Sequence, residues 1–199
     1  MEKLIFSLTL LRSRKALIQK HGKEFWSSFK KSSKEKLKAI LPLTPKIGKS
    51  IFSSNYKFGP AYIAWYKTFI EMGLKQQQAW ENIWLMNEKV VRIMPKFLLN
   101  FLGKAYINSF RKKAPKHIKR QMQNKLHLYD WHITYREISD NTFELDITEC
   151  GLKKLAHAFD ADGLLPGICR MDYMLSNLMG NGFERTKTLG DGDDCCNCG

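Results

Sequence analysis

The feature that most constrains the fold of this chain is a change in hydrophobic period near residue 125. Before it, apolar residues recur every three or four positions, as at Trp80, Ile83 and Trp84, which is the spacing of one face of an α-helix. After it, apolar and polar residues alternate, which is typical of a strand with one buried face. The chain therefore predicts a helical part, residues 1–125, and an α+β part, residues 126–199.

Prolines and glycines predict where the helices of the first part begin and end. Pro60, Pro95 and Pro115 are each expected at a helix start, because the first turn of a helix does not need the N–H that proline lacks. Gly73 is expected to separate two helices. Residues 44–57, which contain Gly, Ser and Asn, are predicted to be the one long loop.

The second part begins with an expected β-hairpin. Residues 131–138 are rich in β-forming side chains, and residues 142–148 alternate with Phe143, Leu145 and Ile147 on one face. An Asp-Asn turn joins the two segments.

Two short helices and two more strands are expected after the hairpin. The helices are predicted at 149–159 and 167–179, a strand at 183–188, and a terminal strand after the turn at 190–193. The predicted class is α+β, with amino-terminal helices packed on a small carboxyl-terminal antiparallel sheet. With 199 residues, of which 44% are apolar, the chain is expected to form a single domain over residues 1–199.

Cysteine usage and the amino terminus indicate a cytoplasmic protein. The five cysteines include the adjacent pair Cys195 and Cys196, and an odd, clustered set does not fit a disulfide framework. The apolar run at 4–11 resembles part of a signal sequence, but Arg12 and Arg14 follow where small residues belong. No apolar run approaches the roughly 20 residues that cross a bilayer.

Charge is divided unevenly between the two parts. Residues 1–125 hold 27 Lys and Arg against 6 Asp and Glu, whereas residues 126–199 hold 6 against 13. A net charge of +14 makes nucleic acid or an anionic membrane a candidate partner. Because no nucleic-acid motif accompanies the lysines, we expect no specific nucleic-acid partner. Weak contact with a membrane surface stays open, and the sequence does not predict an oligomeric state.

The residues that carry chemistry crowd into the last fifty positions. Glu149-Cys150 is followed by Leu165-Pro166 and Cys169-x-x-Asp172, then by Arg185-Thr186-x-Thr188-Leu189, and then by a Gly/Asp turn that leads into Cys196. This order and spacing resembles the L-2-amino-thiazoline-4-carboxylic acid hydrolase family of bacteria. The resemblance is good over residues 125–199. The family typically has an aspartate after the last motif cysteine, where this chain has Asn197.

The resemblance implies a hydrolase that acts on a small, carboxylate-bearing cyclic amidine or thiazoline and is involved in cysteine metabolism. Hydrolysis of such a ring means adding water to the sp² carbon between nitrogen and sulfur, with cleavage of a C–N or a C–S bond. The reaction needs a nucleophile or water activator, a proton donor for the leaving atom and an anchor for the carboxylate.

Three residues are the candidates for these roles. Cys169 is expected in the first turn of a helix, where the helix dipole and free N–H groups favour a thiolate. Asp172 lies three residues on, on the same helical face, and is the candidate for proton transfer. An ionised Asp172 opposes thiolate formation, so both are not expected to be charged in the empty site. Arg185, on an expected strand, is the candidate anchor for a substrate carboxylate.

Four further residues are candidate substrate-binding positions because of their place in the motif: Cys150, Thr186, Thr188 and Cys196. The alternatives are purely structural roles: the cysteines fill the core, and Arg185 pairs with Asp172 or Glu149 to hold the helices and the sheet together. The cysteine spacing is poor for zinc, since only Cys196 and Cys198 are closely paired, so we expect no metal and no cofactor.

Two functions of other classes remain alternatives. The same fold can serve as a non-catalytic small-molecule-binding or sensor domain, as in the vinyl-reductase-type ligand-binding domains that this layout resembles. The basic helices are also compatible with a protein that docks on nucleic acid or an anionic membrane.

Overall fold

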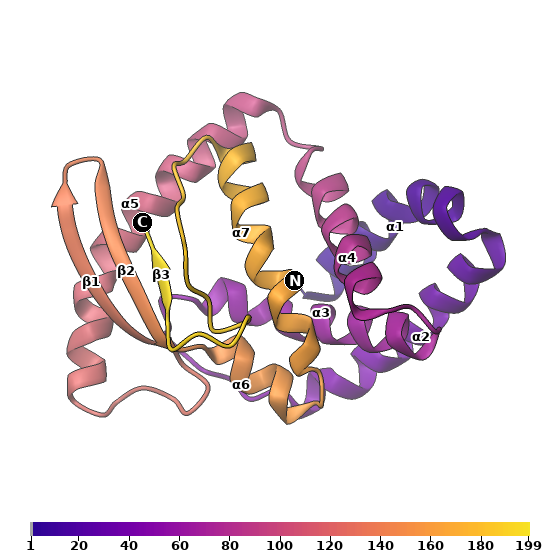
Figure 1. Ribbon diagram of the computed structural model, residues 1–199, viewed down its shortest axis with the longest axis horizontal. Helices are drawn as coiled ribbons and strands as arrows, with labels where there is room; N and C mark the ends of the chain where they lie inside the picture. Colours follow the sequence, from indigo (N-terminus) through magenta and orange to yellow (C-terminus); the bar gives the residue numbers. More distant parts are fainter. Residues whose placement is uncertain (1) are drawn as a thin grey trace.

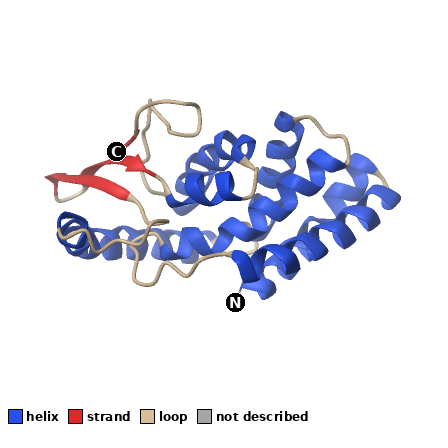
Figure 2. Cartoon of the chain, turned by 90° about the horizontal axis from the view of Figure 1, so that it is seen from below, coloured by secondary structure: helices blue, strands red, loops and turns tan. Residues whose placement is uncertain are grey.

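The computed structural model describes residues 2–199 and has the predicted α+β class. Figure 2 shows the strands gathered at one end of the molecule and helices filling the rest. The first five helices are α1 (Glu2–His21), α2 (Lys23–Leu43), α3 (Ser53–Glu71), α4 (Gln76–Val91) and α5 (Lys96–Met122). The carboxyl-terminal part contains β1 (His132–Ser139), β2 (Thr142–Glu149), α6 (Gly151–Ala158), a 3₁₀ turn (Asp162–Leu164), α7 (Leu165–Met179) and β3 (Cys196–Cys198).

The sheet is antiparallel, in the order β1-β2-β3. The expected hairpin of β1 and β2 is confirmed, with Tyr135 opposite Leu145, and the expected terminal strand pairs with β2 through Cys196 opposite Ile147. After α7 the chain runs back as a coil and returns as β3, so the carboxyl terminus lies beside the hairpin (Figure 1). This coil lies between the sheet and α7 (Figure 1).

Aromatic packing holds the helical part together. Phe29 of α2 is fully buried and stacks on Phe69 of α3, with ring centroids 4.2 Å apart. Phe6 of α1 stacks on Trp65 of α3 at 5.1 Å. The apolar residues that recur at helical spacing in the sequence therefore form one core, in which α1 and α2 both pack against α3.

Helix α5 joins the sheet to the helical part. Phe110 stacks on Phe143 of β2, with centroids 5.5 Å apart. The Gln121 amide bonds both backbone groups of Ile133, donating to the carbonyl at 3.2 Å and accepting from the N–H at 2.9 Å. The edge strand β1 is thus paired by a helix side chain, which leaves fewer of its polar groups unsatisfied.

Two of the expected proline boundaries are wrong. Pro95 does stand just before a helix, at the N-cap of α5, but Pro60 and Pro115 lie inside α3 and α5. Each interior proline costs one helical hydrogen bond. Pro60 is nevertheless buried within α3, so tertiary packing and not the local preference of proline sets the start of this helix. The expected loop at 44–57 is consequently shorter, because α3 already begins at Ser53.

The expected strand at 183–188 is also wrong. Only Arg185 forms a β-bridge there, opposite Cys198. The N–H groups of Thr186 and Lys187 both donate to the side chain of Asn197, and the N–H of Thr188 donates to Asp193. Side chains therefore take the backbone donors that a strand would give to a neighbouring strand.

No helix within residues 2–199 contains a stretch long and apolar enough to cross a membrane.

Candidate functional site

Helix α7 carries Cys169 and Asp172 on one face. The helix ends at Gly180, whose left-handed conformation (φ 71°) lets its N–H bond the carbonyl of Ser176. Cys169 is the fifth residue of the helix, so it lies beyond the first-turn N–H groups that were expected to favour a thiolate. That expectation is corrected, because the helix begins at Leu165 rather than at Gly167.

Arg185 joins the coil after α7 to this face of the helix. Its side chain is 5% exposed and donates to the Asp172 carboxylate at 2.9 Å and to the carbonyl of Cys169 at 2.5 Å. The guanidinium lies over the rings of Tyr173 and Phe183, 5.5 and 5.2 Å from their centroids. Arg185 thus forms the ion pair with Asp172 that the structural alternative predicted. Its guanidinium is almost completely buried, and charged hydrogen bonds are strong where water is excluded.

Cys150, Cys169 and Cys196 lie close to one another beside this pair. The Sγ atom of Cys196 accepts a hydrogen bond from the N–H of Leu189 at 3.2 Å and lies 3.6 Å from the Thr188 hydroxyl. Cys150, at the N-cap of α6, is close enough to Cys169 and Cys196 for their charges to affect its pKa. Four of the predicted site residues, Cys150, Cys169, Thr188 and Cys196, are therefore brought together.

Close approach of the chain fixes this thiol group. A Cβ atom at Gly190 would lie 2.9 Å from the Sγ atom of Cys169 and 3.2 Å from the backbone carbonyl of Leu165. Only glycine lets the coil come this near to α7 without displacing it.

Burial keeps the thiols of Cys150 and Cys169 protonated at neutral pH. It raises the pKa of Cys150 to about 12 and raises the pKa of Cys169 as well. A hydrogen bond with Thr188 partly offsets the shift at Cys169, whereas the charge of Asp172 adds to it. Desolvation disfavours the charged form of a thiol, so Cys150 and Cys169 are thiols and not thiolates in the resting site.

Asp172 is partly accessible to solvent. Its side chain is 44% exposed, yet desolvation raises its pKa against the opposing effect of Arg185. Water therefore reaches this carboxyl group, although neighbouring protein atoms exclude water from part of it. Two tyrosines are close enough to feel the charge of Asp172. Burial, with a smaller contribution from that charge, raises the pKa of Tyr62 in α3 and raises the pKa of Tyr106 in α5 to about 12.

These two tyrosines were missed by sequence reasoning. Tyr62 donates a hydrogen bond to Asn87 at 3.1 Å, and Tyr106 remains 45% exposed. Both stand in helical patterns that are typical of a core, and no local signal distinguishes them. The sequence analysis also did not include Cys198 among the site residues. Burial raises the pKa of Cys198 to about 12, and the charges of Arg185 and Asp172 also affect it, so it lies near both.

Thr186 is not part of this group. It is exposed, and its hydroxyl accepts a hydrogen bond from the Asn197 amide at 2.8 Å. The same amide oxygen accepts from the N–H groups of Thr186 and Lys187. Thr186 and Asn197 therefore shape the coil that carries Arg185 and Thr188. Within residues 2–199, no three His, Cys, Asp or Glu side chains are arranged to hold a metal ion.

Fold and site together define an α+β protein whose polar cluster is shared by α7 and the carboxyl-terminal coil. The chain belongs to the L-2-amino-thiazoline-4-carboxylic acid hydrolase family, whose model matches residues 54–199. The match begins at the start of α3, so it includes much of the helical part as well as the motif region. Neither the curated proteins nor the solved structures give a match to this chain.

Proposed function

We propose that the protein hydrolyses a small cyclic amidine or thiazoline that carries a carboxylate. The observation that carries this proposal is the half-exposed Asp172, held by Arg185 one helical turn from Cys169. Family membership supports the hydrolase class and the thiazoline-carboxylate type of substrate.

Asp172 is the proposed proton-transfer residue. As water adds to the ring carbon between nitrogen and sulfur, the carboxylate accepts a proton from the water. It then returns that proton to the nitrogen or sulfur atom that leaves. Desolvation raises the pKa of Asp172 toward the working pH, which favours a group that must both accept and return a proton.

Cys169 is proposed to contact the reacting carbon. Its thiol is protonated at rest, so attack by sulfur would require transfer of the S–H proton to Asp172 as the substrate binds. Asp172 would pass this proton to the ring atom that leaves, and water would then break the new C–S bond, releasing the hydrated product and the free thiol. If water is the nucleophile, the thiol instead lines the cavity beside Cys150 and Cys196. Both routes assign the proton to the same carboxylate.

Arg185 is proposed to orient Asp172 and to bind the substrate carboxylate with its remaining N–H groups. A guanidinium has five N–H donors, and the two hydrogen bonds to Asp172 and Cys169 leave three. Tyr106 adds a protonated hydroxyl, because its pKa of about 12 keeps the proton in place at neutral pH.

A non-catalytic binding domain is the second candidate. The observation in its favour is that Arg185 and Asp172 already compensate each other and that the thiol of Cys169 is protonated. A binding site needs no activated nucleophile, whereas a hydrolase must create one when the substrate arrives.

Mass spectrometry after incubation with L-2-amino-thiazoline-4-carboxylate tests the proposal. We expect a product heavier than the substrate by one water, and a loss of about 10²–10⁴-fold in rate for Asp172→Asn. Cys169→Ser should abolish turnover if sulfur attacks and leave part of it if the thiol only lines the cavity. Cys195→Ser, outside the thiol cluster, is the matched control and should retain the native rate.

The outcomes separate the two candidates. Saturable binding without a hydrated product would favour the binding domain. Native rates from both Cys169→Ser and Asp172→Asn would remove these residues from the mechanism.

A further inference from the structure

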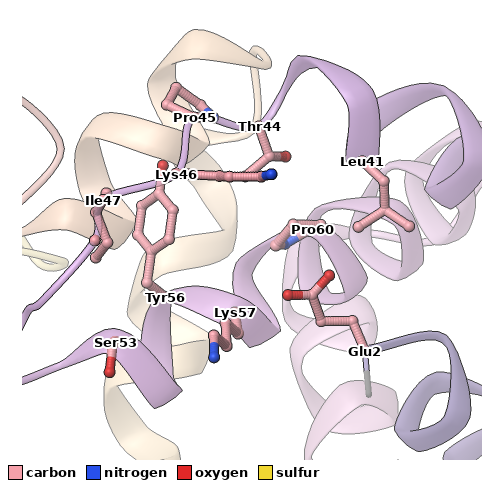
Figure 3. Close-up of a pocket in the computed structure, with 11 residues that line it drawn as sticks. Glu2, Leu41, Thr44, Pro45, Lys46, Ile47, Ser53, Tyr56, Lys57 and Pro60 are labelled. Atoms are coloured by element: carbon pink, nitrogen blue, oxygen red, sulfur yellow. The ribbon is translucent and has the colours of Figure 1, made fainter.

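A pocket that shares no residue with the Asp172 cluster lies at the amino-terminal end of α3 (Figure 3). Its volume is about 320 Å³, and it is formed by the end of α2, the segment at 44–48, the first two turns of α3 and Glu2. Most of these elements precede residue 54, where the family match begins.

Tyr56 lines this pocket and has a buried hydroxyl without a hydrogen-bond partner among residues 2–199. The residue is 3% exposed. In Figure 3 this oxygen points toward the segment of Pro45 and Lys46. The ring is held edge-on by Trp131, with centroids 6.1 Å apart, so the hydroxyl has a fixed direction.

The hydroxyl is a hydrogen-bond donor without an acceptor in the described part of the free protein. Burial raises the pKa of Tyr56, so the proton stays on the oxygen at neutral pH. A buried hydroxyl without a partner is unfavourable, and a ligand oxygen that accepts its hydrogen bond would remove that cost.

The charges at the rim favour a ligand with a single negative charge. Lys46 and Lys57 line the pocket and are exposed, and within residues 2–199 neither forms an ion pair. Glu2 lines the same pocket, so two positive charges face one negative charge. This balance attracts a monoanion and opposes a second negative charge on the ligand.

The remaining walls are apolar. Leu41, Pro45 and Pro60 lie around the charged groups (Figure 3). Small-molecule sites commonly combine such walls with a few placed polar groups. At roughly 30 Å³ for each water-sized group, the volume accommodates about ten non-hydrogen atoms.

We propose that this pocket binds a small monocarboxylate with an apolar body of about ten non-hydrogen atoms. One carboxylate oxygen accepts the hydrogen bond of Tyr56, the lysines neutralise its charge, and the apolar body lies against Leu41, Pro45 and Pro60. The inference does not rest on the hydrolase activity, since the two sites have no residue in common.

Phenylacetate is the probe, followed by two-dimensional NMR of the full chain. We expect saturable shifts at residues 41–60 and none at 169–190. The isosteric neutral phenylacetamide should bind at least about fivefold more weakly, because it lacks the charge. Phenyl phosphate, with its second charge, should bind no more tightly than phenylacetate, and Glu2→Gln should improve its binding.

The variants separate the hydroxyl from general packing. Tyr56→Phe should weaken phenylacetate about fivefold to tenfold, yet leave the Tm of the free protein unchanged or higher, because it removes an unpaired buried group. Lys57→Gln should weaken binding about twofold to threefold, an effect that salt reduces. Lys38→Gln removes the same charge from an exposed position of α2 outside the pocket and should change nothing.

Three results would overturn the proposal. They are shifts at 169–190 instead of 41–60, equal affinity for phenylacetamide and phenylacetate, and unaltered affinity in Tyr56→Phe. No saturable shift at tens of millimolar phenylacetate would also refute it.

Discussion

The helical part and the last twenty residues of this protein are held in place by different forces. In the helical part, aromatic rings such as Phe29 and Phe69 stack in a dry core. In the coil at 180–199, polar side chains bind backbone groups: Asn197 receives two N–H groups and Arg185 reaches two acceptors on α7. The stability of the helical core depends on how much apolar surface is buried, whereas the conformation of the coil depends on the geometry of a few hydrogen bonds.

This difference explains where the candidate site lies. A packed core resists change throughout, so it is a poor place for groups that must meet a ligand. The coil has little apolar area of its own, yet it places Arg185 and Thr188 against a rigid helix. A functional site on a loop held by a rigid scaffold is a common arrangement.

The largest expected effect lies in the helical core. Phe29→Ala should lower the free energy of unfolding by about 3–5 kcal/mol, because the ring is fully buried and the neighbouring helices cannot close the cavity. Urea denaturation measures it. Phe97→Ala, at a side chain that is 76% exposed, is the control and should cost less than about 0.5 kcal/mol. Similar losses in the two variants would mean that this core does not carry the stability.

The next effect lies where the coil meets α7. Arg185→Met should lower the free energy of unfolding by about 2 kcal/mol, because it removes two buried charged hydrogen bonds and the partner of Asp172. Arg136→Met is the matched control, since Arg136 also binds two carboxylates, Glu144 and Asp146, but on an exposed sheet face. There the loss should be much smaller, because water screens an exposed ion pair. Equal losses would show that burial of Arg185 adds nothing.

A smaller effect is expected within the coil itself. Asn197→Ala should cost about 1 kcal/mol, seen as faster hydrogen exchange at Thr186 and Lys187. Asn197→Asp should retain the slow exchange, because both carboxylate oxygens accept and the Thr186 hydroxyl can turn to donate. Fast exchange in the aspartate variant would contradict this account of the coil.

The smallest effect is a dependence on pH. Because the pKa of Asp172 is raised in the folded protein, its contribution to stability is fully present below about pH 4, the unfolded value, and is lost as pH rises through the folded pKa. The stability of the native protein relative to Asp172→Asn should therefore fall across that range and level off above it. Paired denaturation curves at several pH values measure this, and a difference that grows with pH would show that Arg185 outweighs desolvation.

The sequence by itself determined the order of the elements. A period of three to four predicted the helices, alternation predicted the hairpin of β1 and β2, and both patterns follow from which faces are buried. Motif spacing also indicated that Cys169 and Asp172 share a helical face and indicated the family that the comparison then gave. The prediction failed at Pro60 and at 183–188, where long-range packing and side-chain hydrogen bonds outweigh local preference.

Only the tertiary structure decided what surrounds these residues. Whether Cys169 holds a thiol or a thiolate depends on burial. Whether the Arg185 guanidinium is free depends on its two acceptor residues, Asp172 and Cys169, which lie 13 and 16 residues before it in the chain. Tyr62 and Tyr106 approach Asp172 from separate helices, without a local signal in the sequence. Hydrophobic period is a local property of the chain, whereas desolvation and pairing depend on neighbours that are distant in sequence, and so only the folded chain sets the chemistry of the site.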